Sequence, residues 1–168
     1  MTLIRPATSS NDLNAVRQLC WDYRTHLANL SPIEAEMMEL FYPKPKYTAL
    51  MESLEDEHAR PQGIILLAEL DGVPAGCAMT HALDSQTSEI KRVFVTPQAR
   101  GHGIAHKLIE ALMDQARTDG YTRAVLDTSV NLGPARALYA KLGFSERGPY
   151  QEIPDVALPH LVFFEAVL

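Results

Sequence analysis

Apolar side chains recur along this chain with a helical period in some segments and in short continuous runs in others. The clearest helical pattern begins at Ile104 and runs to Ala116. Its apolar positions are Ile104, Leu108, Leu112 and Ala116, with Ala105, Ile109 and Met113 beside them. This spacing predicts an amphipathic helix that packs on a sheet, and Gly120 is expected to end it.

The first third of the chain shows the same spacing. Leu13–Leu27 predicts a helix that Thr8 or Ser9 can cap, and Ser31-Pro32 predicts the start of a second helix. Prolines 43 and 45 are expected to interrupt that helix, and a further one is expected from Tyr47 to Glu57.

Short apolar runs predict the strands. They are Leu3–Arg5, Ile64–Ala68, Ala75–Leu83, Ser88–Val95, Arg123–Asp127, a closing segment at Phe144 and another over Leu158–Val167. Pro134 suits the first turn of a short helix that Gly143 ends. The order of elements predicts a mixed α/β fold, and 168 residues are enough for one domain spanning residues 1–168.

A glycine-bearing turn joins the strand ending at Val95 to the helix beginning at Ile104. Its sequence is Val93-Phe94-Val95-Thr96-Pro97-Gln98-Ala99-Arg100-Gly101-His102-Gly103-Ile104-Ala105. The first turn of a helix has backbone N–H groups without partners, and glycine lets a ligand approach them closely. The turn therefore favours an anion such as phosphate or pyrophosphate, although glycine there can serve turn geometry alone. Neither a P-loop nor a dinucleotide fingerprint fits Gly-His-Gly-Ile-Ala-His.

Composition narrows the possible partners. The formal net charge of −6 argues against nucleic acid or an anionic membrane and mildly favours cationic amines. Cys20 and Cys77 are expected to be buried thiols, and the histidines have no metal-ligand spacing, so no metal is expected. Because no apolar stretch suits a signal peptide or a membrane span, the expected location is the cytoplasm.

Two motifs resemble the GCN5-related N-acetyltransferase (GNAT) superfamily. Gln98, Gly101 and Gly103 match its Gln/Arg-x-x-Gly-x-Gly/Ala signature, and Ala135–Phe144 matches Ala-x-x-Leu-Tyr-x-x-x-Gly-Phe. The resemblance implies the acyl-CoA N-acyltransferase fold, with a mostly antiparallel, splayed sheet flanked by helices. It also implies acetyl-CoA as co-substrate.

The resemblance implies a set of cofactor-binding positions. Val93, Phe94 and Val95 would line the pantetheine arm of CoA, and one of their N–H groups would face the thioester oxygen. The amides of Arg100, Gly101, His102, Gly103, Ile104 and Ala105 would hold the pyrophosphate. The side chains of Arg100 and His102 can add charge there or be plain solvated groups.

Two residues are candidates for catalysis by position in the family pattern. Tyr139 stands where many members place a tyrosine that protonates the departing thiolate, and its alternative is a core-edge residue of the helix. Glu89 stands where some histone-acetylating relatives place a glutamate base, and it is expected to share strand parity with Val93 and Val95. A surface carboxylate is an equal alternative for Glu89, because many relatives deprotonate the amine through water.

The resemblance implies direct transfer of an acetyl group to a primary amine, and a small molecule is favoured over a protein as the acceptor. N-terminal acetylating relatives often carry Asn seven positions before the tyrosine, where this chain has Leu132; Asn131 can instead cap the following helix. The alternatives are a protein N-terminal or lysine acetyltransferase and a CoA-binding regulatory module without catalysis. Trp21, Tyr23, Tyr42 and His160 are candidates for the acceptor pocket, and a homodimer is a possible state.

Overall fold

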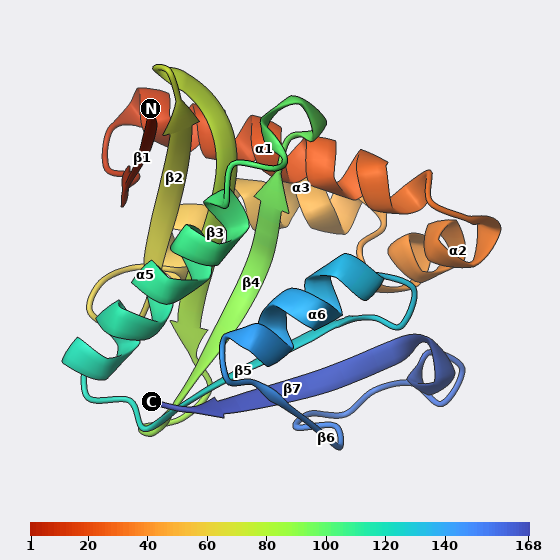
Figure 1. The fold of residues 1–168 in the computed structure, drawn as a ribbon. Coiled ribbons are helices and arrows are strands. Elements are labelled where there is room, and N and C mark those ends of the chain that lie inside the picture. The colour runs from red at the N-terminus through yellow and green to blue at the C-terminus, as the bar shows by residue number, and fades with distance from the viewer.

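The computed structural model describes all 168 residues and contains one seven-stranded sheet in the order β1-β2-β3-β4-β5-β7-β6 (Figure 1). The strands are β1 (Thr2–Pro6), β2 (Ile64–Leu70), β3 (Val73–Ala82), β4 (Thr87–Val95), β5 (Arg123–Ser129), β6 (Ser145–Arg147) and β7 (Leu161–Val167). The helices are α1 (Ser10–Ala28), α2 (Pro32–Phe41), α3 (Lys44–Glu52), α4 (Leu54–Glu57), α5 (Ile104–Thr118) and α6 (Gly133–Lys141). The expected mixed α/β fold is confirmed.

Helices cover both faces of the sheet, and each face has its own apolar core. In Figure 1, α5 and α6 lie in front of the sheet, with α1 and α3 behind it. The buried stripe of α5 and Tyr139 of α6 pack on one face, while α1 and α3 pack on the other through residues such as Val16 and Met51. No helix has the length and apolar character to cross a membrane.

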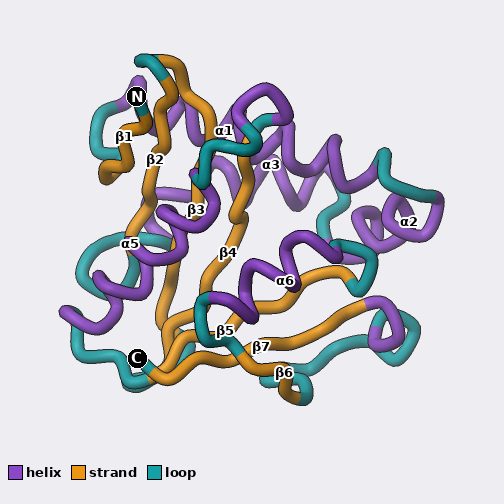
Figure 2. The backbone as a smooth tube through the Cα atoms, in the orientation of Figure 1, coloured by secondary structure: helices purple, strands orange, loops and turns teal.

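The sheet divides at its centre. β4 and β5 form its parallel pair, and they are in register only at Thr87, Ser88 and Glu89, which lie opposite Arg123, Ala124 and Val125. Beyond Glu89 the two strands diverge, as Figure 2 shows. The edge of β4 from Ile90 to Val95 therefore faces β5 without a strand partner, which gives the splayed sheet that the resemblance implies.

A β-bulge in β4 changes which residues share a face. Cys77 lies opposite Phe94 and Met79 opposite Lys91, so one residue of β3 is matched by Arg92 and Val93 together. Arg92 has a φ of 53°. Because of the extra residue, Val93 and Val95 face the α5 core whereas Phe94 faces the α1 core. The expected common parity of Glu89 with Val93 and Val95 was therefore wrong, since parity assumes an unbroken strand.

The helix expected over Tyr47–Glu57 is in fact two helices. α3 already begins at Lys44, with Pro45 in its first turn, and Ser53 separates it from α4. Proline is tolerated in the first turn because its missing N–H would have no partner there. The remaining predicted elements are present within a few residues of their expected positions.

Candidate active site

The turn before α5 presents an open row of backbone donors. The N–H groups from Gly101 to His106 have no acceptor in the protein, on either backbone or side chain. Gly101 and Gly103 have φ values of 86° and 70°, and a Cβ built on either would meet nothing within 4 Å. Gly103 is the N-cap of α5 and provides no side-chain cap. This end of the helix can therefore accept an anion such as a pyrophosphate.

Two of the expected side chains lie beside this turn. Arg100 is exposed, and its Nη2 lies 3.3 Å from Nε2 of His26 on α1. Nδ1 of His102 lies 3.2 Å from the carbonyl oxygens of both Ala99 and Arg100. The His102 ring is thus turned back onto the loop, which leaves Arg100 as the cation available next to the open amides.

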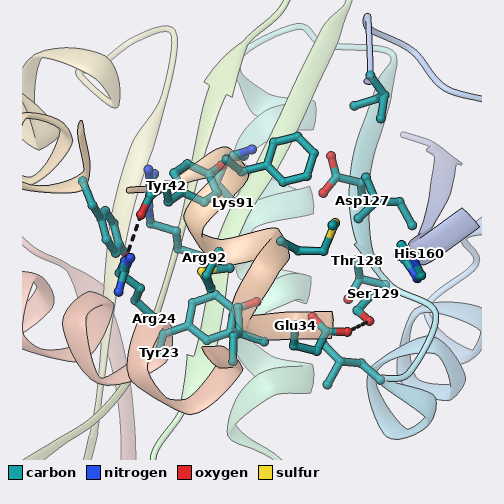
Figure 3. A pocket seen from close by; sticks show the side chains of 18 of the residues that line it. Tyr23, Arg24, Glu34, Tyr42, Lys91, Arg92, Asp127, Thr128, Ser129 and His160 are labelled. Carbon is teal, nitrogen blue, oxygen red and sulfur yellow. Dashed lines mark hydrogen bonds between the residues drawn. The ribbon is translucent and has the colours of Figure 1, made fainter. Parts of the chain in front are cut away.

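A cavity of about 170 Å³ lies at the divergence of β4 and β5. Its walls come from α1, α2, the middle of β4, the end of β5 and residues 151–161 (Figure 3). The residues whose charge or hydrogen bonding matters most are Tyr23, Arg24, Glu34, Tyr42, Lys91, Arg92, Asp127, Ser129 and His160. The cavity combines apolar walls with a few convergent polar groups, which is typical of a small-molecule site.

Two carboxyl groups, those of Asp127 and Glu89, lie at or behind one wall of the cavity. Asp127 lines the cavity, and burial raises its pKa above the ordinary value. The Tyr150 hydroxyl donates to Oε2 of Glu89 at 2.6 Å and lies 3.4 Å from Oδ2 of Asp127. Tyr150 therefore connects the two carboxyl groups.

Glu89 itself lies behind this tyrosine and is 2% exposed. Its Oε1 is 2.6 Å from Nε2 of His81, and its Oε2 is 3.8 Å from Nζ of Lys91. Burial alone would raise the pKa of Glu89, but His81, Lys91 and Tyr150 together lower it below the ordinary value. Glu89 is not among the residues that line the cavity, so its predicted role as base would act through Tyr150.

Tyr139 lies on the other face of the divergence. Its ring packs against Phe144 and Phe164, with centroids 5.9 and 5.7 Å away. Burial, and next the charge of Asp127, raise the pKa of Tyr139 to about 12. The phenol is therefore protonated at neutral pH and available as a donor. The structure also gives this side chain the core contacts of the alternative interpretation.

The residues proposed for the acceptor pocket divide into two groups. Tyr23, Tyr42 and His160 line the cavity. Trp21 is absent from the lining and packs against Tyr47 in a tilted arrangement, with the ring centroids 4.9 Å apart. Asn131 does not cap α6. Its side chain instead donates to Glu34 at 3.3 Å, and the N-cap is Leu132, which makes no side-chain cap bond.

Sequence reasoning missed Lys91, Arg92 and Asp127, which all line the cavity. A signal was present, because charged residues are rare within otherwise apolar central strands. Glu34, Ser129 and Tyr150 carried no comparable signal, since each is an ordinary residue in an ordinary segment. No group of three or more His, Cys, Asp or Glu side chains is placed to hold a metal ion.

Residues 29–144 match the Acetyltransferase (GNAT) family. The chain belongs to this family. It is also 33% identical over 133 residues to the IAA acetyltransferase of Azospirillum brasilense, covering 74% of this chain and 86% of that protein. As a GNAT family member, the protein is an acyltransferase, and the family uses acetyl-CoA.

Solved structures have the same fold at low identity. An acetyltransferase from Streptococcus agalactiae superposes with a TM-score of 0.75 and 22% identity, covering 99% of this chain and 98% of that one. The PaiA N-acetyltransferase from Thermoplasma acidophilum, solved in complex with coenzyme A, superposes with a TM-score of 0.70 and 15% identity, covering 100% and 99%. At these identities the likeness establishes the fold.

Proposed function

We propose that this GNAT protein, acting as one domain over residues 1–168, transfers the acetyl group of acetyl-CoA to the primary amine of a small molecule by direct attack. The observation that carries the proposal is the walled cavity of about 170 Å³ at the divergence of β4 and β5. It lies where the free edge of β4 faces β5, and α2 covers it. Its size suits a small molecule better than a folded protein segment.

The residues present fit CoA on the side of α5. The open amides from Gly101 to His106 supply several donors to a pyrophosphate, and Arg100 adds a positive charge. The free edge of Val93–Val95 can hydrogen-bond an extended chain in the manner of an added strand. Bound acetyl-CoA supplies the activated acetyl group and a thiol as leaving group.

Asp127 supplies the base, and Glu89 lies behind it. An amine must lose a proton before it can attack, and Asp127 is the carboxylate that lines the cavity. Its raised pKa makes it a stronger base than an ordinary aspartate. Glu89 is linked to Asp127 through the Tyr150 hydroxyl, which connects the predicted base to the cavity.

The test is thiol release from acetyl-CoA with a panel of polyamines, amino acids, aminoglycosides, arylalkylamines and peptides. We expect turnover with at least one small amine and an acetylated product by mass spectrometry. Turnover restricted to peptides would contradict the small-molecule acceptor. CoA binding without turnover across the panel would favour a regulatory module.

A further inference from the structure

The cavity carries opposite charges on opposite sides. Figure 3 shows Arg24 and Arg92 on one side, and Asp127, Ser129 and Glu34 on the other. Such a division does not fit a purely cationic acceptor such as a polyamine. If one ammonium group of a polyamine lay at the acidic side, the arginines on the opposite side would repel the next one. Which of these charges is free to bind a ligand follows from their contacts within the protein.

Arg92 is the cation with unused donors. Its Nη1 lies 3.4 Å from Nε2 of His58 and 3.9 Å from Sδ of Met79, and the Tyr47 hydroxyl also interacts with the guanidinium, so these neutral contacts leave part of its five donors for a ligand. No carboxylate lies within 4 Å of the guanidinium. The rings of Tyr42 and Tyr47 also lie beside it, with centroids 6.0 and 5.8 Å from Cζ.

The other two cations of the cavity are already engaged. Arg24 donates from Nε to the carbonyl oxygen of Tyr42 at 3.0 Å and from Nη2 to Glu39 at 2.9 Å. Lys91 lies 3.8 Å from Glu89. A guanidinium offers a planar fork that matches a carboxylate, so Arg92 is suited to bind that group of a ligand.

The backbone supports a dedicated role for Arg92. Its φ of 53° is a costly conformation for a residue with a side chain, and it occurs at the bulge that ends the regular pairing of β4 with β3. The bulge turns the chain so that the consecutive residues Lys91 and Arg92 both line the cavity. A regular strand would direct alternate side chains to opposite faces.

On the opposite side, Asp127 is the carboxylate available to an ammonium group. Glu34 accepts hydrogen bonds from the Ser129 hydroxyl and from Nδ2 of Asn131, so its Oε1 is occupied. Asp127 accepts only the long hydrogen bond from Tyr150, and the Lys91 ammonium acts on it through charge alone. The lining of the same cavity also includes apolar side chains, namely Met37, Met38, Phe41, Ile90 and Leu161.

We propose that the acceptor is a primary amine that also carries a carboxylate, that is, an amino acid with an apolar body. Arg92 binds its carboxylate and Asp127 orients its ammonium group. This inference rests on the proposed function and names the acceptor class of the same cavity.

The experiment compares matched acceptors in the thiol-release assay. The pairs are L-phenylalanine with phenethylamine and with L-phenylalaninamide, L-leucine with 3-methylbutylamine, and 6-aminohexanoate with hexylamine. We expect the carboxylate-bearing member of at least one pair to have a kcat/KM about 10- to 100-fold higher, the usual range for a charge-assisted hydrogen bond. If no pair prefers its carboxylate-bearing member, the proposal is wrong.

The variant Arg92→Gln tests the residue. We expect it to lower kcat/KM for the preferred acid by about 10- to 100-fold, mainly through KM, and to leave kcat/KM for the partner without a carboxylate within about threefold. The control is Arg17→Gln, which removes an arginine of α1 that contacts Met51 and Glu55 and lies outside the cavity. An equal loss of kcat/KM for the acid and for the amine without a carboxylate would show that Arg92 has only a structural role.

A binding measurement separates this proposal from the proposed function. If no amine releases thiol, the proposed function fails, and calorimetric titration of the same acids and amines in saturating CoA still tests the acceptor class. We then expect the acids to bind and Arg92→Gln to weaken them at least tenfold. Acids that bind the unmodified protein no better than their partners without a carboxylate would overturn the proposal. This comparison does not depend on whether Arg92→Gln folds.

Discussion

Tyr139 illustrates how surroundings change what a side chain can do. A buried phenol with a pKa of about 12 holds its proton more tightly than an ordinary tyrosine. An ordinary thiol has a pKa near 8.5, well below the pKa of this phenol, so complete proton transfer from Tyr139 to a departing thiolate is unfavourable. A hydrogen bond from Tyr139 to the sulfur has no such cost, and we propose this form of the predicted acid role.

The variant Tyr139→Phe removes the donor and keeps the ring contacts with Phe144 and Phe164. A hydrogen bond to a developing charge contributes about 1.5–3 kcal/mol, so kcat should fall by about 10- to 100-fold while CoA affinity stays close to normal. Steady-state kinetics with calorimetric titration of CoA measures both. Tyr121→Phe is the control, because Tyr121 donates to Gln62 outside the site. Weakened CoA binding with normal kcat would make Tyr139 a cofactor contact only.

At the scale of elements, the two ends of α5 differ in chemistry although both carry glycine. Gly103 at the amide end and Gly120 after the carboxyl end both have positive φ, and a Cβ at either position meets nothing within 4 Å. Substitution at either glycine therefore strains the backbone in the same way without a clash. Only the amide end carries the partial positive charge and the open donors.

This symmetry makes a controlled test of the anion site. Gly103→Asp places a carboxylate next to the open amides, so we expect CoA affinity to fall at least tenfold through like-charge repulsion and competition for the donors. Gly120→Asp carries the same strain and charge at the far end and should bind CoA within about twofold of the unmodified protein. Calorimetric titration of both variants compares them. Equal affinities in the two folded variants would place the cofactor elsewhere.

Across the whole molecule, the divided sheet implies a link between ligand binding and stability. β4 and β5 hold the two halves of the sheet together through three residue pairs. The glycine-bearing turn before α5 and the cavity both lie beside the gap beyond these pairs. A ligand that spans this gap binds the folded chain and cannot bind the unfolded one. Its binding free energy therefore adds to the free energy of unfolding.

Saturation with CoA should consequently raise the melting temperature. At a concentration about 100 times Kd the gain is about 2.7 kcal/mol, which for a chain of this length corresponds to roughly 5–10 °C. Differential scanning calorimetry with and without CoA measures the shift, and Gly103→Asp should show a much smaller one. An unchanged melting temperature at saturating CoA would argue against a site that spans the gap.

The sequence by itself determined the order of elements, the glycine turn and the place of Tyr139 on α6, because these depend on periodicity and on contiguous motifs. The anion site can be predicted from residues 98–103 alone, because such a site at a helix end is built from neighbouring backbone amides.

The cavity was decided by the tertiary structure. Its charged residues come from α1, α2, β4 and β5. The bulge that brings Lys91 and Arg92 to one wall follows from strand pairing, for which no local residue is a signal. Asp127 is a charged residue at the end of an apolar strand until Tyr150 and Glu89 fold against it. Burial and distance set its pKa and its partners, and both depend on segments that are far apart in the chain.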